Sequence, residues 1–563
     1  MRVTHRSAKH SIVGAWCCAA LAASCAAPDS HRDAGPPRAT IDAGVVEGMY
    51  AGTDSALAVF KGIPFAAPPV GTLRWKPPEP VAHWQGIRKA DSLPPICPQK
   101  RYEIDYFDRL TKRVGGTASP QPTMPMSEDC LHLSVWTTNL RGSQKQPVMV
   151  WIHGGGNVDG WATHGSIDGA ALARRGAVVV MIQYRLGALG FLADSLLTAE
   201  SPHHSSSNYG LLDQIAALRW VQRNATAFGG DSARVTIFGQ SAGAVDVTCL
   251  MVSPLARGLF HRVIAQSGSC VWPVPELARP VSGLTEMPAA ERSGKKLAKN
   301  LGVSGERDVL AAMRAKSAEQ IIAASADDPD ISRDVAADGW VIPTQPDLAF
   351  AKGTQTNVPV LIGSNEDEMR SLARALPVPR IQDYPQQLVD ALGGNPLFRP
   401  LTSRLLAAYP ATDTAAAQRR LFEASSDGFG ASARWMARAM RKAGQRDVYV
   451  YRFTHVIPSP GGRSVGAFHV AEMPFVFGND FGWPEGAQDS TLGEATRGYW
   501  VEFARTGNPN GEGRPTWPPY DSDLDSYLEL GDTLRARDHL RTVQFDLQDS
   551  ALAIVDARLR NKN

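Results

Sequence analysis

The chain has 563 residues, 43% of them hydrophobic, and a formal net charge of +2. This composition supplies a large buried core, so neither metals nor disulfide bonds are needed to stabilise a minimal fold. No block of Lys and Arg stands out, which argues against nucleic acid as the main partner.

The N-terminus is typical of a signal peptide. A basic start, Arg2–Lys9, precedes an apolar stretch from Ser11 to Ala23. That stretch is too short to span a bilayer as a helix, but it matches the hydrophobic region of a leader. We therefore expect residues 1–25 to be a signal peptide and the protein to be exported. No later run is apolar enough to cross a membrane, so we expect no transmembrane span.

The end of this leader has two interpretations. Cys25–Ala27 fits an ordinary signal peptidase site, which predicts a periplasmic or secreted protein. Residues 21–25 (L-A-A-S-C) also resemble a bacterial lipobox, in which Cys25 would be lipidated and anchor an outer-membrane lipoprotein. Residues 26–39 would then be a flexible linker. The sequence leaves both alternatives open.

Cysteine usage agrees with export. Three of the seven cysteines lie in or beside the leader, and the remaining four are an even number, as expected in an oxidising compartment. None has metal-ligand spacing, so we expect neither a metal nor another cofactor. The four are Cys97, Cys130, Cys249 and Cys270.

Residues 40–555 predict one α/β unit. Short runs rich in Val and Ile, typical of strands buried on both faces, alternate with helical stretches such as Leu211–Phe228 and Ala289–Leu301. This alternation predicts a mostly parallel central sheet with helices on both faces. An Ala-rich segment, Ser282–Ser332, is expected to be a helical insertion. The strand candidates are Pro147–His153, Ala177–Gln183, Arg234–Gly239, His261–Gln266, Val358–Gly363 and Asp447–Phe453.

The pentapeptide Gly239–Gly243 (G-Q-S-A-G) is the sharpest local motif. It follows a predicted strand and precedes an apolar helical run. A tight turn between a strand and a helix strains the central residue and exposes its hydroxyl at the edge of the sheet. The following helix N-terminus favours a developing negative charge. The motif predicts that Ser241 is a nucleophile.

A second motif, His153–Gly156 (H-G-G-G), closes an earlier strand. Consecutive glycines let backbone N–H groups turn toward a ligand. The oxyanion of a tetrahedral intermediate needs two or three such donors, each worth about 3 kcal/mol of barrier. We expect Gly155, Gly156 and Ala242 to be these donors. The turn contains neither of two common phosphate-binding motifs, G-K-[ST] and G-x-G-x-x-G.

With these motifs in place, the chain resembles the type B carboxylesterase family, which also contains the cholinesterases. The resemblance extends from about Val45 to Tyr520. It implies an α/β-hydrolase fold, with helical insertions around the active-site mouth, and hydrolysis of small-molecule carboxylic esters through an acyl-enzyme. The motifs that carry it are residues 60–65 (F-K-G-I-P-F), 127–133 (S-E-D-C-L-H-L), 184–191 (Y-R-L-G-A-L-G-F), 208–214 (N-Y-G-L-L-D-Q) and 503–510 (F-A-R-T-G-N-P-N).

The resemblance supplies the other members of a catalytic triad. Glu368 follows a strand that ends in glycine, and His469 lies in a G-A-F-H stretch ahead of V-F-G. The order Ser, acid, His is the one expected of this fold. His469 would transfer the proton of Ser241, and Glu368 would orient and stabilise the imidazole. Glu366 and Asp367 are adjacent alternatives for the acid.

Further roles also come from the resemblance. Ser267 and Glu472 match a pair that supports the triad by hydrogen bonding. Cys97 and Cys130 match the family's first disulfide. Cys249 and Cys270 do not clearly match its second, so their pairing stays open.

Four residues depart from the family pattern. Met369 replaces the usual Gly after the acid, and Gln183 stands where Asn precedes the Y-R-L-G stretch. Asn157 follows the glycine run where an aromatic residue is usual, and Asp246 lies one turn into the helix after Ser241, where a small Ser is common. A charge at position 246 could face His469, but we expect Asp246 to contact a polar neighbour. None of the four departures touches the triad, but Asn157 and Asp246 leave the shape of the pocket open.

Three functional hypotheses share these residues. An esterase leads, and an amidase or lactonase would use the same triad. A non-catalytic binding member of the family is disfavoured because the triad is complete. The cholinesterase subgroup is disfavoured because the loop from Cys97 to Cys130 lacks Trp and because Gln240 replaces a Glu.

Variable segments, Ser282–Ser332 and Ser371–Phe429, are expected to form the pocket walls. The sequence indicates neither the natural substrate nor the oligomeric state.

Overall fold

Within the described residues, the fold is built around an 11-stranded mixed sheet. The computed structural model describes residues 35–52, 54–100, 102–117, 124–163, 166–282, 286–372, 380–391 and 396–561. The predicted signal peptide with Cys25, and most of the predicted linker, lie outside these ranges. Pro36–Asn563 form one compact unit. Among the helices of the described ranges, none combines the length and the hydropathy that a membrane span requires.

The middle of the sheet is parallel and its edges are antiparallel. The spatial order is β16-β15-β14-β13-β10-β9-β7-β8-β6-β4-β3, and all pairs from β15 to β8 are parallel. This confirms the predicted α/β class. The strands are β3 (Met49–Ala51), β4 (Asp54–Pro64), β6 (His132–Thr137), β7 (Gln146–Ile152), β8 (Val178–Ile182), β9 (Gly230–Gln240), β10 (Arg262–Gln266), β13 (Val360–Asn365), β14 (Val448–Phe453), β15 (Tyr527–Leu530) and β16 (Arg535–Arg537).

The central strands lie where Val and Ile runs predicted them. Every residue of β8, β13 and β14 is buried, as expected of strands covered on both faces. Register brings apolar residues side by side, with Val150 of β7 between Val180 and Ile237. Smaller sheets are formed by β1 (Arg38–Ile41), β2 (Gly44–Glu47) and β5 (Ile87–Lys89), and by β11 (Val281–Ser282) and β12 (Glu286–Met287).

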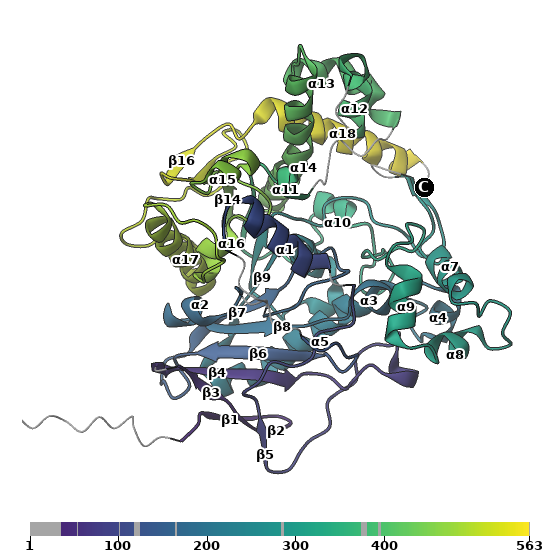
Figure 1. The fold of residues 1–563 in the computed structure, drawn as a ribbon, viewed down its shortest axis with the longest axis vertical. Helices are drawn as coiled ribbons and strands as arrows, with labels where there is room; N and C mark the ends of the chain where they lie inside the picture. Colours follow the sequence, from purple (N-terminus) through teal and green to yellow (C-terminus); the bar gives the residue numbers. More distant parts are fainter. Residues whose placement is uncertain are drawn as a thin grey trace, which may run out of the picture. The chain divides into compact units, whose positions relative to one another are not determined.

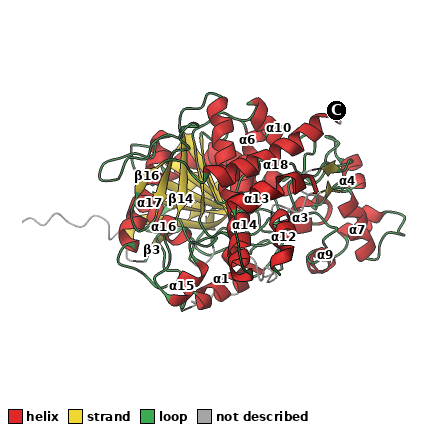
Figure 2. Cartoon of the chain, turned by 90° about the horizontal axis from the view of Figure 1, so that it is seen from above, coloured by secondary structure: helices red, strands yellow, loops and turns green. Residues whose placement is uncertain are grey.

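Helices cover both faces of the sheet (Figures 1 and 2). One face packs against α2, α16 and α17, and the other against α5, α6 and α14. The helices are α1 (Tyr102–Arg113), α2 (Ala170–Arg174), α3 (Gly187–Phe191), α4 (Ser195–Glu200), α5 (Tyr209–Asn224), α6 (Ala242–Val252), α7 (Arg292–Asn300), α8 (Val309–Arg314), α9 (Ala318–Ser325), α10 (Pro346–Lys352), α11 (Met369–Leu372), α12 (Tyr384–Asp390), α13 (Thr402–Ala408), α14 (Thr414–Lys442), α15 (Pro460–Val465), α16 (Met473–Phe477), α17 (Asp489–Thr506) and α18 (Thr542–Asn561).

The Ala-rich insertion is mostly helical, as its composition predicted. It contains α7, α8 and α9, which lie together on one side of the ribbon (Figure 1). Its first residues form the short antiparallel pair β11 and β12 instead of a helix. The predicted helix Ala289–Leu301 is α7, Arg292–Asn300, and the predicted helix Leu211–Phe228 is α5 followed by a 3₁₀ turn at Ala225–Phe228.

Two disulfide bonds link loops to the core. Cys97 and Cys130 are joined, with their Cα atoms 5.0 Å apart. Cys249 in α6 and Cys270 after β10 are also joined, with a Cα separation of 5.3 Å. The second pairing, which the sequence left open, connects the helix after the pentapeptide to the loop after the next strand.

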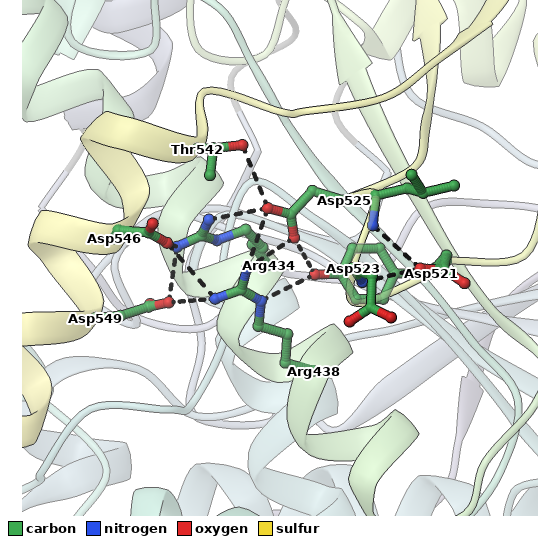
Figure 3. A network of polar contacts seen from close by, with 10 residues as sticks. Arg434, Arg438, Asp521, Asp523, Asp525, Thr542, Asp546 and Asp549 are labelled. Carbon is green, nitrogen blue, oxygen red and sulfur yellow. Dashed lines mark hydrogen bonds and ion pairs between the residues drawn. The ribbon is translucent and has the colours of Figure 1, made fainter.

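A buried ion-pair network joins α14 to the C-terminal helix α18 (Figure 3). The Arg434 side chain has no exposed surface and pairs with Asp525 at 3.1 Å, Asp546 at 2.9 Å and Asp549 at 2.7 Å. Arg438, one turn later, contacts the same three carboxylates. Buried charges of this kind depend on their partners, because an uncompensated charge in the interior is very costly.

We expect Arg434→Ala to destabilise the protein strongly. Removing Arg434 leaves the buried Asp525 carboxylate with only the partly exposed Arg438 as a cationic partner, a loss of about 3–5 kcal/mol. The control is Arg505→Ala, which breaks a partly exposed helical pair with Glu502, and exposed pairs of this kind are worth about 1 kcal/mol at most. Thermal melting of both variants measures the difference. Equal shifts in melting temperature would contradict the assigned role of the network.

Candidate active site

Ser241 occupies a sharp turn between β9 and α6. The strand ends at Gln240 and the helix begins at Ala242, so Ser241 alone makes the turn, with φ 56° and ψ −123°. This conformation is strained for a residue with a side chain. A Cβ atom at Gly243 would collide with the carbonyl oxygen of Ile152, which explains why the motif needs glycine there.

The candidate residues converge because the central strands are parallel. Ser241 follows β9, Ser267 follows β10, Glu368 follows β13, and His469 lies in the loop that follows β14 and α15. These strands are neighbours in the sheet and run in the same direction. Their carboxyl ends therefore lie along one edge, where open α/β sheets place their sites.

His469 and Glu368 form a short buried hydrogen bond. Nδ1 of His469 lies 2.5 Å from Oε2 of Glu368, and both side chains are almost completely buried. The other carboxylate oxygen of Glu368 accepts a hydrogen bond from the backbone N–H of Asn365 at 2.7 Å. Since a carboxylate only accepts, Nδ1 carries a proton.

The two neighbouring acids, Asp367 and Glu366, make other contacts. Asp367 pairs with Arg370 at 2.8 Å and accepts a hydrogen bond from the Ala467 N–H at 3.1 Å. Glu366 pairs with Arg452 at 3.1 Å and is about half exposed. Of these three adjacent acids, Glu368 is the one that contacts His469.

The second ring nitrogen of His469 contacts Gln240. Nε2 of His469 lies 3.1 Å from Nε2 of the Gln240 amide, which donates to the ring lone pair. Within the described residues, the Ser241 hydroxyl has no hydrogen-bond partner. Gln240 thus occupies the nitrogen of His469 that would accept a hydrogen bond from the Ser241 hydroxyl. The sequence indicated Gln240 only as a replacement for Glu.

The glycine turn after β7 presents free backbone donors. Gly155 and Gly156 have φ values of 104° and 64°, which favour glycine. In the part of the chain that the structure describes, no hydrogen bond to the protein uses the N–H of Gly155, Gly156 or Ala242. Gly156 and Ala242 line the same cavity as Ser241. The turn and the start of α6 can therefore present N–H groups to an anion beside Ser241.

A cavity of about 590 Å³ opens beside Ser241. Its walls come largely from the predicted insertion, Ser282–Ser332, and from the loop after β10. The sequence did not indicate that this loop would line the cavity. From Ser371–Phe429, the other predicted wall segment, Phe429 contributes; its ring lies 5.5 Å from that of His469. The walls are mainly apolar: Ala242, Val245, Trp272, Pro273, Val274, Pro275, Met287, Pro288, Ala289, Ala290, Pro329, Val335 and Phe429.

Glu472 lies in a buried polar cluster behind the histidine. Its carboxylate accepts hydrogen bonds from Asn365 Nδ2 at 2.7 Å and from Gln266 Nε2 at 3.1 Å. Burial raises the pKa of Glu472, and the nearby charge of Glu368 raises it further. The buried hydroxyl of Ser267, whose φ is 55°, has no hydrogen-bond partner within the described residues. Gln266, which the sequence did not single out, makes the contact with Glu472.

Two of the four departures from the family pattern, Asn157 and Asp246, lie against each other. Nδ2 of Asn157 donates to Oδ1 of Asp246 at 3.1 Å, and both residues are buried. The other oxygen of Asp246 accepts from Gln214 Nε2 at 2.5 Å. Asp246 therefore contacts polar neighbours, as expected.

Comparison with known proteins finds similar esterases. A sequence model described as the carboxylesterase family matches residues 35–548. A fumonisin B1 esterase from Sphingopyxis macrogoltabida is 36% identical, over 84% of this chain and 83% of that protein. A human cocaine esterase is 34% identical, over 89% and 88%. A solved structure of a PNB esterase superposes with a TM-score of 0.75 at 29% identity, covering 91% of this chain and 99% of that one.

The family match, the two relatives and the solved structure each span most of the chain. This chain belongs to the carboxylesterase family.

Proposed function

We propose that this carboxylic ester hydrolase works through an acyl-enzyme on Ser241, with His469 as proton carrier and Glu368 as its partner. The observation that carries the proposal is the 2.5 Å hydrogen bond between Glu368 and His469, in a site that also holds the strained Ser241. A non-catalytic role is disfavoured, because a binding protein needs neither this bond nor the turn.

Acylation begins when Ser241 attacks the ester carbonyl carbon. His469 accepts the hydroxyl proton at Nε2 as the Oγ–carbon bond forms. The Gln240 amide must therefore first break its hydrogen bond to Nε2. The protonated His469 then donates to the alcohol oxygen as the ester C–O bond breaks. Water repeats the sequence on the acyl-enzyme and releases the acid. The negative Glu368 stabilises the imidazolium in both halves.

Three backbone groups would hold the oxyanion. The N–H groups of Gly155, Gly156 and Ala242 are the donors that we assign, each worth about 3 kcal/mol in the transition state. Their positions are fixed by the glycine turn and by the helix start, so no rearrangement cost arises when charge develops.

The cavity favours esters with a sizeable apolar group. Its volume of about 590 Å³ exceeds what an acetyl group fills, and its walls are mainly apolar. Contact with such walls is worth about 0.8 kcal/mol per buried methylene. Amide or lactone hydrolysis uses the same chemistry, but no observed feature favours either one.

We also propose that the protein is exported and that its N-terminal leader is removed, either by ordinary signal peptidase cleavage or by cleavage just before Cys25, which would then carry the lipid. The two disulfides support this, because such bonds persist in oxidising compartments.

Ser241→Ala is expected to lower kcat for p-nitrophenyl butyrate by about 10⁴-fold or more, since the nucleophile is lost. Ser550→Ala, which changes a hydroxyl in α18 that bonds only to a helix carbonyl, serves as the control and should retain wild-type turnover. Residual turnover within tenfold of the wild type in a folded Ser241→Ala variant would exclude Ser241 as the nucleophile.

Glu368→Gln should lower kcat by roughly 10³–10⁴-fold, because a neutral partner cannot stabilise the imidazolium. Glu366→Gln is the matched control, since Glu366 pairs with Arg452 outside the triad, and we expect a change of less than about threefold. Steady-state kinetics on both variants measures the contrast. The reverse order of effects would move the acid to position 366.

Lengthening the acyl chain should raise kcat/KM. Two further methylenes in the apolar cavity are worth up to about 15-fold between p-nitrophenyl acetate and butyrate. Measuring the acetate, butyrate and hexanoate series tests this. A steady decrease from acetate onward would show that the acyl group does not occupy the cavity.

A further inference from the structure

Asn157 and Asp246 meet beneath the glycine turn although they are 89 residues apart in sequence. Asn157 directly follows Gly156, and Asp246 lies on α6 one turn after Ala242. Their 3.1 Å hydrogen bond is thus a direct link between the turn and the nucleophile helix. Both side chains are at most 4% exposed, so water does not weaken the bond.

Each partner is held on its other side. The Asn157 side-chain oxygen lies 3.1 Å from the Tyr184 hydroxyl, which also lies 2.8 Å from the carbonyl oxygen of His153 at the start of the turn. The backbone oxygen of Asn157 accepts from the Gly187 N–H at 2.6 Å. Asp246 is held by Gln214 of α5. The link therefore belongs to a buried network that spans β7, the loop after β8, α5 and α6.

The oxyanion donors come from both sides of this link. Gly155 and Gly156 belong to the turn, and Ala242 belongs to α6, so the distance between the donors depends on how the turn sits against the helix. We propose that Asn157 and Asp246 are a positioning pair that fixes this distance. The inference rests on the proposed function of the site. It assigns both residues a role in transition-state stabilisation that acts through the oxyanion donors, and Asn157 also lines the cavity beside Ser241.

Packing alone does not explain why an aspartate is buried at position 246. Burial raises the pKa of its carboxyl to about 7, and the charge of Asp334 in the cavity wall adds to the effect. His153 is no compensating cation, because burial lowers its pKa to about 4. A buried carboxylate without an ion pair destabilises a fold relative to an apolar residue. Such groups occur preferentially where a specific geometry is required.

The test uses four variants of the full chain. Asn157→Gly removes the amide but suits the φ of 57° at this position. Asp246→Ala removes the acceptor, and the double variant completes a cycle. Asp246→Asn keeps an oxygen for the Asn157 amide. Its new NH₂ group can donate to Gln214 Oε1, which has no partner within the described residues, once the Gln214 amide flips by about 180°. The matched control is Asp338→Ala, a buried aspartate outside the cavity that accepts from Ser205 and Ile342.

The readouts are kcat and KM for p-nitrophenyl butyrate, the Ki of an alkyl trifluoromethyl ketone, and the melting temperature. The ketone forms a negatively charged adduct with the nucleophile and so reports on the oxyanion donors. We expect Asn157→Gly and Asp246→Ala each to lower kcat by about 10–100-fold with KM changed less than about threefold, and to raise Ki in parallel. The double variant should be no worse than the poorer single one, and Asp246→Asn should stay within about threefold of the wild type.

Three outcomes would overturn the proposal: wild-type kcat and Ki in folded Asn157→Gly, losses confined to KM, or single effects that multiply in the double variant. A loss in Asp338→Ala equal to that in Asp246→Ala would assign the effect to stability alone. If Asp246→Ala does not fold, Asn157→Gly and Asp246→Asn still decide the matter. Failure of the proposed function itself would appear separately, as wild-type turnover that survives Ser241→Ala.

Discussion

The buried hydrogen bond between Glu368 and His469 is the interaction on which the candidate site depends. It fixes the ring tautomer, so that Nε2 faces Gln240 with a lone pair. The bond can be this short because the backbone N–H of Asn365 holds the carboxylate in place and water is excluded. Every later step in the proposed chemistry uses the proton acceptor that this bond creates.

The parallel sheet brings Glu368 and His469 close enough to form that bond. Strands β9, β10, β13 and β14 run in the same direction, so loops distant in sequence end at one edge. The core below is close-packed and rigid, which lets it maintain strain at Ser241. The walls of the cavity instead come from insertions and loops, where variation does not disturb the core. Chemistry and specificity are thereby assigned to different parts of the chain.

Local patterns in the sequence predicted much of this arrangement. Val and Ile runs located the central strands, and the setting of G-Q-S-A-G between a strand and a helix located the turn at Ser241. Contacts between distant residues could not be predicted in this way. The Cys249–Cys270 pairing, the amide of Gln240 on His469 and the meeting of Asn157 with Asp246 depend on how loops pack, and periodicity carries no information about that.

Covalent labelling of the nucleophile tests the central claim most directly. The full-length protein would be reacted with a fluorophosphonate ester, digested, and analysed by mass spectrometry. The account predicts one label per chain, on the peptide that contains Ser241, with turnover lost in proportion to labelling. A label on another residue that abolishes turnover, or full turnover with Ser241 labelled, would contradict it.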